Sequence, residues 1–128
     1  MIVDLHAETV GAGPAVLLVH GMGDDASGWA AAVAGLKDEF ACTTIDLPGH
    51  GRSPAPAERA AYERESVLAS MDAALTRDGA APGGAVFVGH SLGGYLGLAH
   101  CLTRPGVIRG FVTPVASSAT DDATNGSS

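Results

Sequence analysis

The sequence predicts an α/β fold in which helices cover both faces of a mostly parallel sheet. Short apolar runs alternate along the chain with longer segments whose apolar residues recur at helical spacing. The runs at residues 15–19 and 85–88 are continuously apolar, which is typical of strands buried on both faces. Because strands that alternate with helices are joined by right-handed crossovers, this order predicts parallel neighbours.

The first half of the chain predicts three strands and one helix. Residues 2–10 alternate between apolar and polar types, which indicates a half-exposed strand, and the Gly and Pro residues at 11–14 predict a turn. After the strand at 15–19, Ser27 could cap a helix. One face of that helix would carry Trp29, Val33, Leu36 and Phe40. A buried strand is then predicted at residues 42–45.

The second half predicts two helices and two strands. A Gly- and Pro-rich loop at residues 47–56 precedes a helix from about 58 to 77. The strand at 85–88 leads into a helix from residue 92, and a last strand is predicted at 107–112. The helix that begins at residue 92 is predicted to have one apolar face, formed by Leu92, Tyr95, Leu96, Ala99 and Leu102.

Length and composition bound the function. The chain has 128 residues, 46% hydrophobic and 16% charged, which suits one small domain with a buried core. A net charge of −7 without a cluster of Lys or Arg argues against nucleic acid and membrane surfaces as partners. No apolar stretch approaches the roughly 20 residues of a membrane span and no secretory leader is visible, so we expect a cytoplasmic protein. Cys42 and Cys101 lack metal-site spacing, which predicts buried free thiols.

The most informative motif is the pentapeptide Gly-His-Ser-Leu-Gly at residues 89–93. It lies between a predicted strand and a predicted helix, a context typical of a serine nucleophile on a sharp elbow. Gly89 and Gly93 lack the Cβ atoms that would collide in so tight a turn, and Ser91 would project its hydroxyl from it. The N–H of Leu92, at the start of the helix, could stabilise negative charge on a substrate oxygen.

Three segments together resemble the α/β-hydrolase family. They are His-Gly-Met-Gly at residues 20–23, Asp-Leu-Pro-Gly-His-Gly-Arg-Ser at 46–53 and Gly-His-Ser-Leu-Gly-Gly at 89–94. The resemblance covers about residues 2–113 and implies the family's α/β sheet with Ser91 as nucleophile. It also implies that the N–H of Met22 joins that of Leu92 in the oxyanion hole. His20 and Gly21 would shape this loop, His20 more as a brace than as a base.

A serine nucleophile also needs a histidine, oriented by a carboxylate. His100 lies nine residues after Ser91 on the predicted helix and roughly on its opposite face, so it cannot reach the hydroxyl. Asp121 and Asp122 are the only later acids, and no predicted strand holds them. We therefore expect residues 1–115 to form the N-terminal part of the domain, an incomplete fold lacking the C-terminal strands and cap, and residues 116–128 to form a polar, disordered tail.

The sequence thus predicts a serine hydrolase of carboxylic esters or similar acyl compounds, truncated and weakly active or inactive as this chain. No metal and no organic cofactor is implied. The partner is a small-molecule substrate, and an exposed sheet edge could allow self-association. Two alternatives stay open: a non-catalytic binding or assembly element, and a dinucleotide-binding module. The last rests on the GxGxxA spacing at residues 21–26 and on Asp46.

Overall fold

The structure, a computed structural model, describes residues 1–77 and 84–113. Its centre is a five-stranded sheet with the order β1-β3-β2-β4-β5. The edge strand β1 runs antiparallel to β3, whereas β2, β3, β4 and β5 pair in parallel. The strands are β1 (Ala7–Val10), β2 (Ala15–Val19), β3 (Ala41–Ile45), β4 (Ala85–Gly89) and β5 (Ile108–Val112). The predicted mostly parallel sheet is therefore confirmed.

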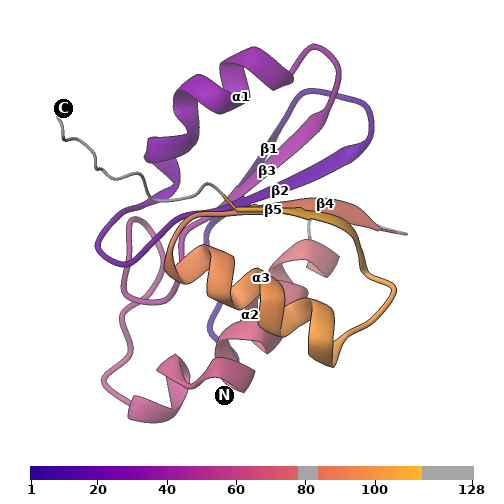
Figure 1. Cartoon of the computed structure of the whole chain (residues 1–128). Helices are drawn as coiled ribbons and strands as arrows, with labels where there is room; N and C mark the ends of the chain where they lie inside the picture. Colours follow the sequence, from indigo (N-terminus) through magenta and orange to yellow (C-terminus); the bar gives the residue numbers. More distant parts are fainter. Residues whose placement is uncertain (78–83, 114–128) are drawn as a thin grey trace, which may run out of the picture.

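Helices cover both faces of this sheet, as the sequence predicted. Helix α1, with a 3₁₀ turn before it, lies on one face, and α2 and α3 lie on the other (Figure 1). The 3₁₀ turns are η1 (Ala26–Trp29) and η2 (Arg59–Tyr62), and the helices are α1 (Ala30–Leu36), α2 (Arg64–Arg77) and α3 (Leu92–Thr103). In the part of the chain that the structure describes, no helix combines the length and apolarity needed to cross a membrane.

Strand β2 contributes to two hydrophobic cores because its alternate side chains point to opposite faces. Leu17 and Val19 belong to the larger core, between the sheet and helices α2 and α3. Val16 and Leu18 belong to the smaller core, which α1 covers. Burying one such side chain contributes about 1.5–3 kcal/mol, so the continuous apolar run fixes β2 between the two layers.

The first strand is shorter than the predicted 2–10. Val3 and Leu5 leave the sheet and insert into the larger core, where they are 4% and 1% exposed. The Val3 N–H donates to the Ser70 Oγ of α2 at 2.8 Å. Burial against α2 therefore outweighs strand pairing for this segment, and only Ala7–Val10 pairs with β3.

Three helix predictions also need correction. The helix predicted from about residue 58 begins at Arg64, because the 3₁₀ turn η2 ends at Tyr62 and Glu63 is extended. Ser27 does not cap a helix; it lies within η1, whose cap is Asp25, which accepts a hydrogen bond from the Ser27 N–H at 2.8 Å. On α3, Tyr95 and Leu102 are 52% and 75% exposed rather than buried. The reason is Gly97, where a Cβ would lie 2.5 Å from the Phe111 ring, so α3 packs on the sheet through glycines.

The thiols of Cys42 and Cys101 are free, as predicted, but only Cys42 is fully buried and Cys101 is half-buried. Burial raises the pKa of the Cys42 thiol above its usual value. The polar tail at 116–128, with Asp121 and Asp122, lies outside the residues that the structure describes.

Candidate active site

Ser91 occupies a strained elbow between β4 and α3. Its φ of 56° and ψ of −113° make it the one non-glycine residue with positive φ in the described ranges. A Cβ on Gly89 would lie 2.6 Å from the Gly94 nitrogen, and one on Gly93 would lie 2.8 Å from the His20 carbonyl oxygen and overlap that of Val19. Only glycine fits these two positions, which allows the close approach of α3 to the ends of β2 and β4.

The loop after β2 lies directly against the elbow. A Cβ on Gly21 would approach the Ser91 Cβ to 3.1 Å. Across residues 1–77 and 84–113, the backbone N–H groups of Met22 and Leu92 have no hydrogen-bond acceptor. The Leu92 N–H is also at the N-terminus of α3, where the helix dipole favours negative charge. Two free donors near an exposed serine hydroxyl suit stabilisation of an oxyanion.

His20 is a buried brace of this loop, with 1% of its surface exposed. Its Nδ1 lies 2.7 Å from the Gly21 carbonyl oxygen, and its Nε2 accepts a hydrogen bond from the Leu47 N–H at 3.0 Å. Since a carbonyl only accepts and an N–H only donates, the proton is on Nδ1. Both ring nitrogens are thus occupied by backbone groups, and neither can act as a base toward Ser91.

His50 makes a second connection between the same two loops, and sequence reasoning did not single it out. The Gly23 N–H donates to its Nε2 at 3.0 Å, and its Nδ1 lies 2.9 Å from the Pro48 carbonyl oxygen. Its ring centroid is 5.0 Å from that of His20. The only sequence signal is its place within the segment 46–53.

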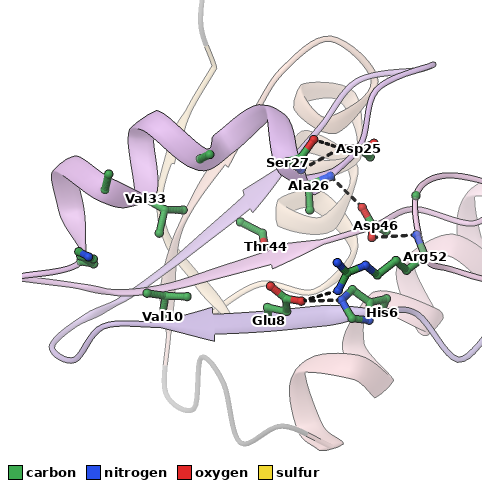
Figure 2. Close-up of a pocket in the computed structure, with 14 residues that line it drawn as sticks. His6, Glu8, Val10, Asp25, Ala26, Ser27, Val33, Thr44, Asp46 and Arg52 are labelled. Atoms are coloured by element: carbon green, nitrogen blue, oxygen red, sulfur yellow. Dashed lines mark hydrogen bonds and ion pairs between the residues drawn. The ribbon is translucent and has the colours of Figure 1, made fainter.

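Asp46 fixes the loop after β3 to the loop after β2 (Figure 2). Its carboxylate accepts hydrogen bonds from the backbone N–H of Ala26 at 2.7 Å and of Arg52 at 3.1 Å. A Cβ on Gly51 would lie 2.5 Å from the same carboxylate. The Asp46 side chain therefore faces the chain's own amides rather than the open position that a ribose hydroxyl would need.

No side chain of the described part hydrogen-bonds to the Ser91 hydroxyl. His100 is 2% exposed, and its Nε2 lies 2.8 Å from Asp72 Oδ1 on α2. Burial raises the pKa of Asp72, but hydrogen bonds from His100 and Arg104 outweigh this effect, so the pKa lies below its usual 3.8. His100 thus belongs to a cluster between α2 and α3 that nothing in the sequence had indicated.

Two of the hollows in the described part of the chain are candidates for the substrate site. The larger, of about 540 Å³, lies between α1 and the strands β1 and β3 (Figure 2). It is lined by neither Ser91 nor the two free N–H groups, and its Glu8 already accepts hydrogen bonds from His6 at 2.9 Å and Arg52 at 3.1 Å. The other, of about 440 Å³, is not lined by Ser91 either, but it includes Met22 and Leu92, the neighbour of Ser91, in its wall. The second hollow therefore fits the elbow chemistry.

The hollow beside the elbow has an apolar floor and a mixed rim. Leu47, Val67 and Leu96 are buried beneath it, at 1%, 7% and 3% exposure. The exposed rim includes Tyr62, Arg64, Tyr95 and Met22. In the described ranges, no group of three or more His, Cys, Asp or Glu side chains is arranged to hold a metal ion.

The sequence-predicted site residues converge at the carboxyl ends of β2 and β4. Ser91 and Leu92 begin α3, with Gly89 and Gly93 on either side of the turn. The loop of residues 20–22 lies beside them, held by the contacts given above. Meeting at the ends of adjacent parallel strands is what an open α/β sheet imposes on residues that follow its strands.

Comparison with known proteins agrees with this geometry. The profile of the alpha/beta hydrolase fold matches residues 14–125. The pimeloyl-[acyl-carrier protein] methyl ester esterase of Methylococcus capsulatus is 38% identical over 104 residues, which are 81% of this chain and 37% of that protein. The enzyme of the same name from Vibrio parahaemolyticus is 36% identical over 118 residues, which are 92% of this chain and 42% of that protein. The chain therefore spans less than half the length of these relatives.

Solved structures show the same fold. An epoxide hydrolase from Vigna radiata superposes with a TM-score of 0.80 at 27% identity, over 87% of this chain and 36% of that one. E-2-(acetamidomethylene)succinate hydrolase gives a TM-score of 0.75 at 29% identity, over 85% and 39% of the two chains. The elbow geometry, the profile match over most of the sequence and these superpositions agree. The chain belongs to the α/β-hydrolase fold family.

Proposed function

We propose that this chain carries the nucleophile and oxyanion hole of a serine hydrolase acting on carboxylic esters. The observation that supports it most is the strained backbone of Ser91, held beside the free N–H groups of Met22 and Leu92. A non-glycine residue in that region costs about 1–3 kcal/mol, a cost found mainly at functional sites. Two relatives that bear an ester hydrolase name, at 38% and 36% identity, support the same reaction class.

The proposed chemistry is acyl transfer through Ser91. The Ser91 Oγ attacks the ester carbonyl carbon, a base takes its proton, and the two N–H groups hold the oxyanion. Collapse expels the alcohol, which leaves with a proton, and water then releases the acid from the acyl-enzyme. A serine at the elbow suits this route, whereas the epoxide-hydrolase chemistry of the family uses a carboxylate. Since no described side chain serves as the base, we propose that this chain alone is weakly active or inactive.

The hollow beside the elbow is where we place the apolar part of the substrate. Its volume of about 440 Å³ falls within the range of small-molecule pockets. The floor formed by Leu47, Val67 and Leu96 offers hydrocarbon surface to an acyl chain, at about 25 cal/mol per Å² buried. Met22 and Leu92 border this floor. A substrate whose carbonyl oxygen accepts from their N–H groups can therefore place its acyl chain in the hollow.

Covalent labelling with a fluorophosphonate tests the nucleophile. We expect slow formation of one adduct, seen by intact mass, on the wild-type chain and none on Ser91→Ala. Added imidazole should accelerate the labelling, because it can supply the missing base. Absence of any adduct with imidazole present, or an adduct that persists in Ser91→Ala, would refute the proposal.

A second candidate is a non-catalytic assembly element, favoured by the apolar surface around β5. Among the described strands β5 lies at one edge of the sheet, and Val112 is 52% exposed. Leu98 and Leu102 on α3 are 51% and 75% exposed. An open edge beside apolar side chains favours self-association. Light scattering across a range of concentrations tests it: a constant monomer mass excludes assembly through this edge.

A further inference from the structure

We propose that His50 is a positioning residue for the oxyanion hole, and that it holds the Met22–Gly23 loop only while its imidazole is neutral. We call the hydrogen bonds of His50 with Gly23 and Pro48 the His50 latch. These bonds are present in the structure whatever the function, whereas their role in catalysis rests on the proposed function. His50 comes from the loop after β3, and the residue it holds follows directly after Met22.

The hydrogen-bond partners of His50 determine its protonation state. The Pro48 carbonyl oxygen, 2.9 Å from Nδ1, can only accept, so Nδ1 carries a proton. The Gly23 N–H, 3.0 Å from Nε2, can only donate, so Nε2 carries a lone pair. One tautomer of the neutral ring satisfies both contacts, and the doubly protonated imidazolium satisfies only the first.

His20 holds the same loop in the same way but is better protected. Its Nε2 accepts from Leu47 at 3.0 Å, and the ring is 1% exposed. His50 is half-buried and forms part of the wall of the hollow beside the elbow, so water reaches it. Of the two histidines that join these loops, His50 is therefore the one whose ring is more accessible to solvent protons.

Protonation of His50 would place an N–H against the Gly23 N–H. Two donors repel, and the loop that carries the Met22 N–H would lose its tie to the loop after β3. The titratable and charged groups that face His50 are the ring of His20, Asp25 across the loop, and Tyr62 and Arg64 on the wall of the same hollow.

Amide hydrogen exchange by NMR tests the latch in the intact chain, without requiring activity. In the wild type, we expect the Gly23 amide to exchange about fivefold to tenfold more slowly than in His50→Phe, which keeps an aromatic ring but has no acceptor. After correction for intrinsic exchange, this protection should vanish once the pH is low enough for the NMR shifts to show that the His50 ring is protonated.

His50→Gln is the matched control, because its side-chain oxygen can accept at the Nε2 position and does not titrate there. We expect this variant to protect Gly23 equally before and after the pH is lowered, while the Leu47 amide reports separately on His20. Protection of Gly23 that is the same in His50→Phe, or that does not change when the His50 ring titrates, would overturn the proposal. A working latch on a chain whose Ser91 cannot be labelled would instead leave the latch standing and refute the proposed function.

Discussion

Replacing Ser91 with glycine should stabilise the fold while removing the nucleophile. At φ 56° and ψ −113°, any side chain with a Cβ is strained, and glycine is not. The Ser91 side chain is exposed and makes no capping hydrogen bond to α3, so its loss forfeits no burial and no capping bond. Strain at the nucleophile is therefore the dominant local contribution that Ser91→Gly changes.

The size of the effect follows from two opposing terms. Relief of the strained backbone should contribute about 1–3 kcal/mol. The greater freedom of glycine in the unfolded chain should cost about 0.4–1 kcal/mol. We therefore expect a net increase of about 1 kcal/mol in the free energy of unfolding, relative to Ser91→Ala. Alanine is the matched control because both variants lack the hydroxyl and differ only in the Cβ.

Urea unfolding at neutral pH, followed by circular dichroism, measures this difference. A higher midpoint for Ser91→Gly than for Ser91→Ala, with equal slopes, supports the strain argument. If Ser91→Gly unfolds at the same urea concentration as Ser91→Ala or at a lower one, the elbow is not strained in solution and the reasoning fails.

Two further stability predictions concern packing and pH. Gly93→Ala should destabilise the fold by about 2 kcal/mol or more, because its Cβ would overlap the Val19 carbonyl. Gly35→Ala in α1, with no atom within 4 Å of the new Cβ, should stabilise by about 1 kcal/mol, and a loss there would contradict the packing argument. Asp72→Asn should lower stability at pH 7, because the folded pKa of Asp72 lies below 3.8. That difference should shrink as the pH falls through and below about 3.8. Thermal unfolding that shows the same difference at pH 7 and throughout this lower pH range would refute it.

The sequence was most informative where one local rule acted alone. The continuous apolar run at 15–19 predicted a strand buried on both faces, and the position of Ser91 between a predicted strand and a predicted helix predicted an elbow. The sequence was less informative where tertiary packing determined whether a segment pairs in the sheet or is buried in the core. Nothing local shows that Val3 and Leu5 prefer the core under α2 to pairing with β3.

The face of α3 was mispredicted for a related reason. Periodicity ranks side chains by hydrophobicity, so it placed Tyr95 and Leu102 inside. The structure instead turns Gly97 toward the Phe87 and Phe111 rings, because only glycine lets the helix come so close. The hydrogen bond between His100 and Asp72 joins α3 to α2 through two residues that are 28 positions apart, and no sequence spacing indicates it.

The polar residues of the three motifs serve mainly to accept hydrogen bonds from loop backbones. A backbone N–H that is buried without an acceptor costs free energy, and the carbonyl groups of these loops accept from only some of the loop amides. Side chains of these loops therefore supply further acceptors. Asp46 accepts hydrogen bonds from the N–H groups of Ala26 and Arg52. His20 accepts one from the Leu47 N–H, and His50 accepts one from the Gly23 N–H. The Met22 and Leu92 amides are left without an acceptor in the described part. The same network that satisfies the surrounding amides thus leaves two of them free beside Ser91, which is what a developing oxyanion requires.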